Sequence, residues 1–379
     1  MTPDFTCLLI PLAMAGLAIL NAGLTRSRST SHILLASLCA VSVAMLAFVI
    51  VGFSVAGNGR LFALSLDLTG IAGPLMLLMQ LFSVGIAALI PVASGAERWR
   101  IAAVCASTAL LAGLVYPLFA HWAASAGWLG ALGFTDAGGA GSIQVLGGIS
   151  ALCVVWIVGP RQGKFTSEGI PTAMPGHNAA FVLFGCLLTL VGWFGLTTAQ
   201  NPILAAINTV LAAAAGAIAA LVGTRVRFGK PDASLTANGW VAGLVAISAS
   251  APYVKPVSAM LIGFVAGGAI VFAIEIVEFR MGVDDPAGAI SVHAVAGSWG
   301  LLAVSIFADG RGPFLAQAMG IATLIGFALP MSYGLNWLLN RFVPYRVSAS
   351  GERQGMDLFE LGAGAYPEFV TQREDFMRR

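Results

Sequence analysis

His293 and Gln144 are polar side chains whose position in an apolar sequence suggests chemistry. Each follows an aspartate, Asp285 or Asp136, by eight residues, and each lies among apolar and small residues. Eight residues of α-helix advance about 12 Å, so both side chains would lie deep within any helix that the aspartates begin. Imidazole holds or relays a proton near neutral pH, whereas an amide only donates and accepts hydrogen bonds. The spacing therefore predicts proton or hydrogen-bond chemistry in an apolar interior.

Each of these residues also has a purely structural interpretation. An ionisable group deep in a membrane helix is costly and usually marks a pathway, which favours a functional role for His293 over that of a simple buried histidine. Gln144 could equally line a pathway or join helices through its amide. Asp136 and Asp285 are typical helix N-caps, and Pro286 suits a first helical position, so capping is the leading interpretation of the aspartates.

The elements that would carry these residues are membrane spans. The chain has 379 residues, of which 58% are hydrophobic and 9% charged, whereas soluble domains have about 25% charged residues. A membrane helix needs about 20 mostly apolar residues. Eleven runs qualify: 5–24, 32–56, 70–95, 101–121, 138–158, 179–199, 202–223, 235–253, 257–278, 287–307 and 314–340. The sequence predicts an all-α polytopic membrane protein, which excludes a cytosolic enzyme, a nucleic-acid binder and a disordered scaffold.

The sequence gives no sign of catalysis or of a cofactor. The five cysteines lie singly in apolar runs, without a CxxC motif or clustered histidines, and predict small core residues rather than a disulfide framework or a metal site. Neither an HExxH motif nor a phosphate-binding P-loop occurs. We therefore expect no enzyme activity and no bound cofactor or metal.

Basic residues indicate the orientation, because they concentrate on the cytoplasmic side of membrane proteins. With the N-terminus outside, 16 of the 19 Lys and Arg residues fall in inside loops or in the C-terminal tail. Only Arg60, Lys255 and Arg311 fall outside. We therefore expect eleven helices with an N-out, C-in orientation. The cytosolic tail, 346–379, is too short for a catalytic domain.

Two segments, 136–152 and 285–301, align without gaps and suggest a repeat. Identical residues are Asp136/Asp285, Gly139/Gly288, Ala140/Ala289, Ser142/Ser291, Gly148/Gly297 and Leu152/Leu301. With the expected orientation, the first segment enters from outside and the second from inside. This predicts inverted repeats over about 5–158 and 179–307, plus an extra helix over about 314–340, in a transmembrane domain of residues 1–345. In such folds the transport site lies near the midplane, where the repeats meet.

These motifs resemble the ammonium transporter family, which comprises ammonium transporters, methylammonium permeases and Rhesus proteins. VDDPAGAISVHAVAGSWG at 283–300 is close to the family signature in its tenth helix. Further similar segments are AGLAILNAGLTRSRS (15–29), GAERWR (95–100), NGWVAGLV (238–245) and GMDLFELGAGAY (355–366). The resemblance covers nearly the whole chain and implies ammonium or ammonia transport, one pore per subunit, eleven helices and a homotrimer. A single compact chain of this topology suggests a bacterial inner (plasma) membrane.

The resemblance assigns roles to matching positions, with departures. The family's two stacked pore histidines correspond to Gln144 and His293, so only the second is a histidine here. One stacked gate phenylalanine corresponds to Leu196 and the other to Phe82 or Ser83. The vestibule tryptophan corresponds to Ala124, with Trp122 and Trp128 nearby. The implied substrate site comprises Asp136, Trp193, Phe82, Leu196, Gln200 (at a family serine) and Trp122, and the implied structural residues are Asp285, Pro286 and Asn208.

These departures shape the expected transport. Glutamine cannot carry a proton, and Leu196 and Ala124 reduce the gate and the aromatic cation cage. We therefore expect weak ammonium recruitment and passage closer to net NH3 than to net NH4+. Two alternatives stay open. One is an ammonium-sensing or poorly conducting family member, and the other is a channel for another small solute such as methylamine, CO2 or a small amide.

The tail bears on regulation. Leu361, Gly362 and Ala363 stand where the family has a His-Gly-Glu triplet. The resemblance implies that this region is where nitrogen-regulatory PII-type proteins act, and the loss of the triplet argues against inherited gating by such a partner. The expected partners are therefore ammonium or ammonia, further copies of this chain and the lipid membrane, with no nucleic acid.

Overall fold

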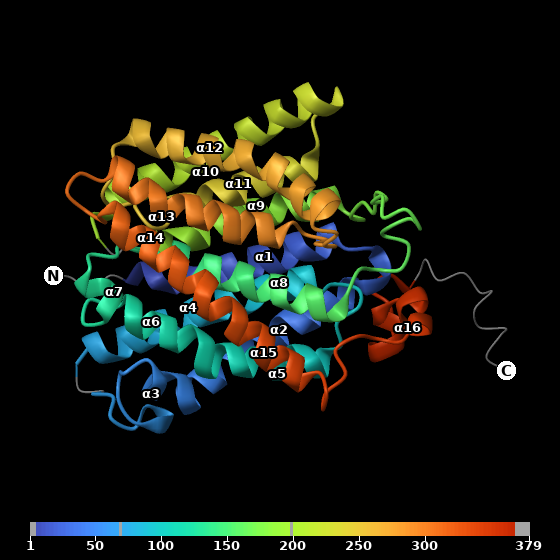
Figure 1. The fold of residues 1–379 in the computed structure, drawn as a ribbon, viewed down its shortest axis with the longest axis horizontal. Helices are drawn as coiled ribbons and strands as arrows, with labels where there is room; N and C mark the ends of the chain where they lie inside the picture. The colour runs from blue at the N-terminus through green and yellow to red at the C-terminus, as the bar shows by residue number, and fades with distance from the viewer. Residues whose placement is uncertain (1–4, 68–69, 198–199, 368–379) are drawn as a thin grey trace.

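The computed structural model describes residues 5–67, 70–197 and 200–367. Within these ranges the chain is helical apart from two isolated bridges, Trp99 with Arg346 and Phe165 with Pro171, and no β-strand forms. The long helices lie side by side along a common direction, and the connections gather at the two ends of the bundle (Figure 1). The predicted all-α class is confirmed.

Many of the long helices consist of joined pieces, because π-helical turns interrupt the α-helical pattern. The first half of the chain forms η1 (Phe5–Leu9), α1 (Ile10–Leu24), η2 (Ser27–Ser29), α2 (Thr30–Ala47), η3 (Phe48–Gly52), α3 (Phe53–Val55), η4 (Leu61–Ala63), α4 (Ala72–Ser94), α5 (Ile101–Leu110), η5 (Leu111–Val115), α6 (Tyr116–Ala123), α7 (Trp128–Ala131), η6 (Ala140–Val145) and α8 (Leu146–Val158). The second half forms α9 (Ala179–Thr197), α10 (Pro202–Phe228), α11 (Ala233–Ile247), α12 (Pro256–Glu275), η7 (Ile276–Arg280), η8 (Ile290–Val295), α13 (Ala296–Phe307), α14 (Phe314–Thr323), η9 (Leu324–Ala328), α15 (Leu329–Leu339), α16 (Ala349–Gln354) and η10 (Asp357–Leu361).

Within the described residues, ten helices are long and apolar enough to cross a membrane, with mean hydropathies between 1.7 and 2.8. They correspond to ten of the eleven predicted runs. The run predicted over 235–253 differs, since α11 has only 15 residues and the chain continues in turns up to residue 254. The carbonyls of Ala251 and Val254 accept hydrogen bonds from the Asn208 side chain, at 2.8 Å each, so a side chain replaces helical partners there.

Small residues let the helices approach one another closely. At Gly192 of α9, a side chain would collide with the backbone of Ala13 in α1. At Gly267 of α12, a side chain would collide with the carbonyl of Gly216 in α10. In lipid, such close approach supplies the van der Waals contact that holds helices together. Part of the high glycine content of the chain is therefore used for packing.

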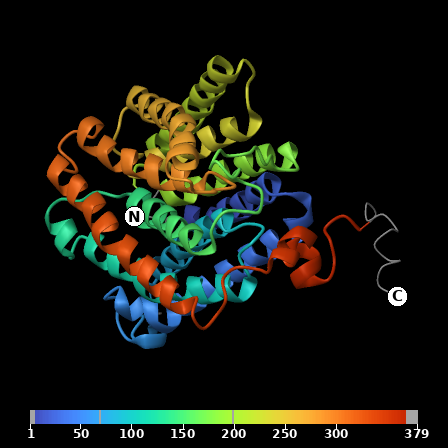
Figure 2. The same ribbon diagram turned by 45° about the vertical axis from the view of Figure 1, so that its right-hand side comes forward.

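The predicted tail folds back on one end of the bundle. Its helices α16 and η10 lie beside that end in both views (Figures 1 and 2). Residues 198–199 of the predicted sixth run and 368–379 of the predicted tail lie outside the described residues. Following the expected orientation, we call the end with Gln200 and Arg311 the outer end, and the end with Arg98, Arg161 and the tail the inner end.

Candidate functional site

His293 and Gln144 meet in the interior, although 149 positions separate them in the chain. Gln144 lies in η6, His293 lies in η8, and both are buried. The side-chain carbonyl oxygen of Gln144 is 2.7 Å from His293 Nδ1. A carbonyl oxygen only accepts hydrogen bonds, so His293 Nδ1 carries the hydrogen and the Nε2 of the neutral ring keeps its lone pair. Gln144 therefore selects one tautomer of the imidazole.

The amide nitrogen of Gln144 is the second notable group of this pair. It is buried, and among the described residues it has no hydrogen-bond partner. A buried N–H group without a partner is costly, so a small molecule that accepts a hydrogen bond would be stabilised beside it. The pair thus combines an amide N–H donor with an imidazole lone pair. These groups suit a neutral molecule that has both N–H bonds and a lone pair.

Asp136 supplies hydrogen-bond acceptors at the start of η6. Its carboxylate accepts from the backbone N–H groups of Gly141 and Ser142 and from the Ser142 hydroxyl, at 2.9–3.1 Å. Gly139 precedes the turn with φ +81°, so the helix begins only after it. Burial raises the pKa of the Asp136 carboxyl, while these hydrogen bonds act in the opposite direction. The carboxylate satisfies N-terminal N–H groups as a capping residue does.

Asp285 precedes η8 as Asp136 precedes η6. Its carboxylate accepts from the Ile290 N–H and from the Ser94 hydroxyl, both at 2.7 Å, and burial raises its pKa against these bonds. The sequence predicted Pro286 at the first helical position. In the structure it lies instead in the turn before η8. The reason is Gly288, whose φ of +69° is left-handed and prevents a helix from starting earlier.

Trp193 and Asn208 join helices of the second half of the chain. Trp193 of α9 is fully buried, and its indole N–H donates to the Leu244 carbonyl at 2.9 Å and to the Ser248 hydroxyl at 2.8 Å. Asn208 of α10 holds the turn after α11 in the way described above. Leu196, one helical turn after Trp193, is also buried. These three residues lie inside the packed helices near the outer end.

Gln200 belongs to a cluster that joins two outer loops. Its side-chain oxygen accepts a hydrogen bond from the Tyr253 hydroxyl at 2.9 Å. The guanidinium carbon of Arg311 lies 4.3 Å from the centroid of the Tyr253 ring, within cation–π range. A cation of the protein therefore already occupies this aromatic face. Sequence reasoning missed the contact, because a pairing between distant loops leaves no local pattern.

Phe82 and Trp122 have other neighbours. Phe82 is partly buried in α4. The Trp122 ring lies 4.5 Å from Phe327 of η9 and 6.4 Å from Trp128, measured between centroids. These aromatic partners come from the last long helix and from the start of α7. The structure does not give Trp122 a ring contact with Tyr253 among the described residues.

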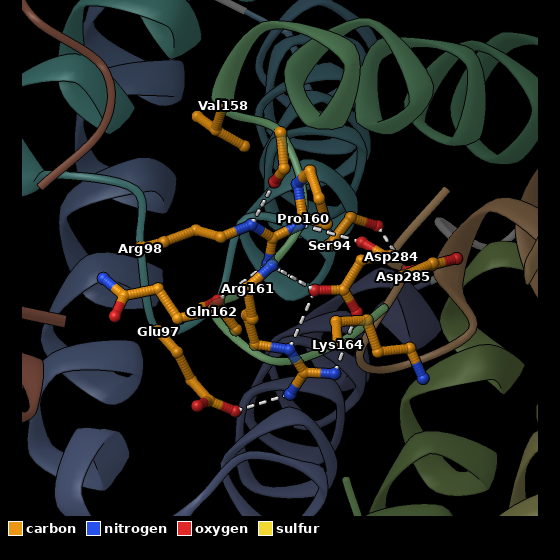
Figure 3. A network of polar contacts seen from close by, with 12 residues as sticks. Ser94, Glu97, Arg98, Val158, Pro160, Arg161, Gln162, Lys164, Asp284 and Asp285 are labelled. Carbon is orange, nitrogen blue, oxygen red and sulfur yellow. Dashed lines mark hydrogen bonds and ion pairs between the residues drawn. The ribbon is translucent and has the colours of Figure 1, made fainter. Parts of the chain in front are cut away.

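A buried ionic network closes the inner end (Figure 3). The Arg161 guanidinium contacts the Asp284 carboxylate at 2.9 Å and Glu97 at 2.7 Å. Glu97 also pairs with Arg26, and Arg98 lies 3.7 Å from Asp284. Burial alone would raise the pKa of Asp284, but the charges of Arg98 and Arg161 outweigh it and lower this pKa to about 2. The sequence showed these charges at helix ends but not their pairing.

The tail is attached next to this network. The Asp357 carboxylate accepts the His32 N–H at 2.7 Å, and the Glu360 carboxylate lies 2.9 Å from His32 Nε2. Glu360 also accepts from the Ile101 N–H at 3.0 Å and pairs with Arg100 at 3.3 Å. The tail is therefore docked, although Leu361, Gly362 and Ala363 replace the triplet expected from the resemblance.

Comparison with known proteins identifies the family. A sequence model of the Ammonium Transporter Family matches residues 5–366. Ammonium transporter Amt2 of Archaeoglobus fulgidus is 35% identical, with 96% of this chain and 86% of that protein covered. Ammonium transporter Amt2 of Haloferax mediterranei is 30% identical, with 95% and 88% covered.

Solved structures agree with this assignment. A protein described as a sensor Amt protein superimposes with a TM-score of 0.90 at 28% identity, covering 94% of this chain and 96% of that chain. Candida albicans Mep2 has the same fold, with a TM-score of 0.81 at 23% identity and 96% and 89% covered. These matches agree with the apolar helices of a multi-pass membrane protein that is a transporter and not an enzyme. The chain belongs to the ammonium transporter family.

Proposed function

We propose that this chain conducts ammonia across the membrane past His293 and Gln144, with passage closer to net NH3 than to net NH4+. The observation that supports this most directly is the 2.7 Å contact between Gln144 Oε1 and His293 Nδ1. It holds the neutral imidazole with its Nε2 lone pair available, while the Gln144 amide retains N–H groups. Ammonia has N–H bonds for the first group and a lone pair for the second.

The same contact argues against a proton relay through two side chains. A relay needs both groups to take up and release a proton near neutral pH, which an amide does not do. A bare cation near the middle of a membrane is costly. Gln144 therefore favours passage of the neutral molecule, with the proton left on the side of entry.

The outer cluster supports weak recruitment of ammonium. Arg311 stacks on Tyr253, and the exposed Lys255 lies two residues along the chain. Two positive charges near an aromatic face repel a third cation, and the face itself is already used. We propose that Gln200, Phe82, Leu196 and Trp122 contribute to the outer approach. Trp193, Asn208 and Asp136 act by positioning helices.

We further propose eleven spans with an N-out, C-in orientation, in which α11 and the turns after it form the eighth span. The contacts among loops are consistent with this alternation. Arg26, Arg161 and the tail gather at the inner end, whereas Gln200 and Arg311 gather at the other. The parallel construction of the Asp136 and Asp285 segments supports inverted repeats within a transmembrane domain of residues 1–345. We also propose a homotrimer, which the family resemblance implies.

The test is an ammonium jump on purified protein in proteoliposomes, with charge movement and internal pH recorded together. We expect internal alkalinisation without a comparable current, because NH3 enters and takes up a proton inside. The variant Gln144→His restores a second titratable ring and is expected to add a current. A wild-type current as large as that of Gln144→His would contradict the proposal. Gln144→Leu, which removes the amide, is expected to reduce the alkalinisation rate.

A second candidate function is ammonium sensing, which the likeness to the sensor Amt protein favours. In this case the chain binds ammonium without conducting it, and a separate partner reads the docked tail. Ammonium binding in the absence of both alkalinisation and current would support sensing over transport.

A further inference from the structure

A small cavity at the inner end lies beside the start of η8, the element that carries His293. Its volume is about 40 Å³, and its walls include Ile274, Glu278, Asp285 and Ser291. A cavity needs about 10–15 Å³ in this measure to hold one water molecule. The cavity therefore has room for about one to three water-sized molecules. The cavity lies two residues along the chain from His293, at Ser291.

Ser291 provides an unused hydrogen-bonding group in this cavity. Its side chain is fully buried, and among the described residues its hydroxyl has no hydrogen-bond partner. In the matching segment of the first half, the Ser142 hydroxyl donates to Asp136 at 2.9 Å. The second half departs from this pattern, since Ser94 from α4 donates to Asp285 in place of Ser291. The Ser291 hydroxyl is therefore available to form a hydrogen bond with a molecule bound in the cavity.

The charges around the cavity favour a cation. Asp285 and Glu278 contribute two carboxylates, and Lys164, which pairs with Glu278, contributes one positive charge. Each Asp285 oxygen accepts one hydrogen bond, from Ser94 or from Ile290, and each retains further acceptor capacity. A ligand that donates hydrogen bonds to carboxylate and hydroxyl oxygens therefore fits better than an anion.

We propose that this cavity is an inner binding site for a water-sized monovalent cation, ammonium, held by Ser291, Asp285 and Glu278. The proposal rests on the proposed ammonia pathway, because the inner end is where ammonia that has passed His293 becomes protonated again. The site differs from the outer cluster, where Arg311 occupies the aromatic face of Tyr253. It gives the inner side of this chain a stronger affinity for ammonium than the weakly recruiting outer side.

The test uses thallium(I), a monovalent cation close to ammonium in size, with the full chain purified in detergent. Calorimetric titration measures the affinity, and anomalous diffraction from crystals grown with thallium(I) locates the ion. We expect an anomalous peak between Ser291 and Asp285. The variant Ser291→Ala is expected to bind at least about tenfold more weakly, since a hydrogen bond to a charged group is lost. Ser298→Ala is the matched control, because the Ser298 hydroxyl donates to the backbone carbonyl of Ala294, one helical turn earlier.

A second variant guards against a change in folding. Glu278→Gln combined with Lys164→Met removes the ion pair as a whole and is also expected to weaken binding. The control is Glu275→Gln, which removes a half-buried carboxylate that pairs with Arg227 outside the cavity and is expected to leave binding unchanged. Density in the cavity without an anomalous signal would identify water and overturn the proposal. Equal affinity in Ser291→Ala and wild type would also overturn it. Thallium bound at this site in a protein that shows no ammonia flux would contradict the proposed function and leave the site established.

Discussion

At the scale of single residues, the informative feature is the direct contact between an amide and an imidazole in the interior, Gln144 with His293. Gln144, which the resemblance places at a family histidine, has its side-chain oxygen 2.7 Å from His293 Nδ1. The geometry is consistent with selection of one tautomer of His293 by this amide. The Gln144 amide nitrogen and the Ser291 hydroxyl have no hydrogen-bond partner in the part of the chain that the structure describes. This could not be predicted, because a group's hydrogen bonds depend on all its neighbours in space.

Arg311 is expected to weaken the recruitment of ammonium at the outer end. Replacing it with glutamine removes a positive charge beside the Tyr253 ring and frees the aromatic face. We expect Arg311→Gln to lower the external ammonium concentration for half-maximal alkalinisation by about two- to fivefold at low ionic strength. The measurement is the alkalinisation rate in proteoliposomes against ammonium concentration. The effect should shrink at high salt, where exposed charges are screened.

The control for this prediction is Arg60→Gln, which removes an exposed arginine from another predicted outer loop. An equal shift in both variants would mean that general surface charge is responsible. No shift in either would separate Arg311 from ammonium recruitment.

At the scale of elements, the hydrophobic pattern predicted the long helices well and their interruptions poorly. Ten predicted runs correspond to long apolar helices, since length and composition suffice to mark them. The early end of α11 was missed because residues 248–254 continue the apolar run with Ala249, Ala251 and Val254, although Ser248, Ser250 and Pro252 lie among them. Their backbone is held by polar side chains from other helices, such as Asn208. The start of η8 was also predicted too early, because Gly288 has a left-handed φ and a sequence does not reveal the φ of a glycine.

Docking of the tail is expected to depend on the Glu360 carboxylate and therefore on pH. Glu360 joins η10 to α2 and α5, and its pKa is lowered from the usual 4.5: burial opposes this, but the hydrogen bonds from His32 and Ile101 outweigh burial. A lowered carboxyl pKa stabilises the docked tail above pH 4.5, and this contribution is lost as the pH falls below that value. Glu360→Gln should therefore loosen the tail at neutral pH and remove part of the acid sensitivity.

Hydrogen exchange over residues 349–361 is the measurement for this prediction. We expect Glu360→Gln to speed exchange about three- to tenfold at neutral pH. Glu168→Gln, at an exposed position in a loop, is the control. Unchanged exchange in Glu360→Gln would show that Asp357 and the packing of α16 hold the tail without this carboxylate.

At the scale of the whole molecule, charge is distributed in a way that the sequence only partly revealed. Counting basic residues predicted which loops share an end, and the ionic contacts agree with that grouping. The count could not predict that Arg98, Arg161, Glu97 and Asp284 would be buried together. Their pairing depends on where loops from distant parts of the chain meet, at the inner ends of α4, α8 and η8. The network thereby joins both halves of the molecule.

Asp284 is the member of this network whose loss should matter most. Asp284→Asn leaves Arg98 and Arg161 buried with less compensating charge, which we expect to destabilise the protein by about 3–5 kcal/mol. The pH dependence has a definite sign. Because the pKa of Asp284 is lowered from 3.8 to about 2, its contribution is present above about pH 4 and is lost as the pH falls towards 2. The variant should lack this acid-sensitive part. Thermal unfolding in detergent, followed between pH 2 and pH 7, measures both effects.

Asp309→Asn, at an exposed outer position, should unfold like wild type. The double variant Asp284→Asn with Arg161→Gln should recover part of the loss, since it removes one uncompensated cation. If Asp284→Asn unfolded at the wild-type temperature at pH 7, the network would not be what joins the two halves.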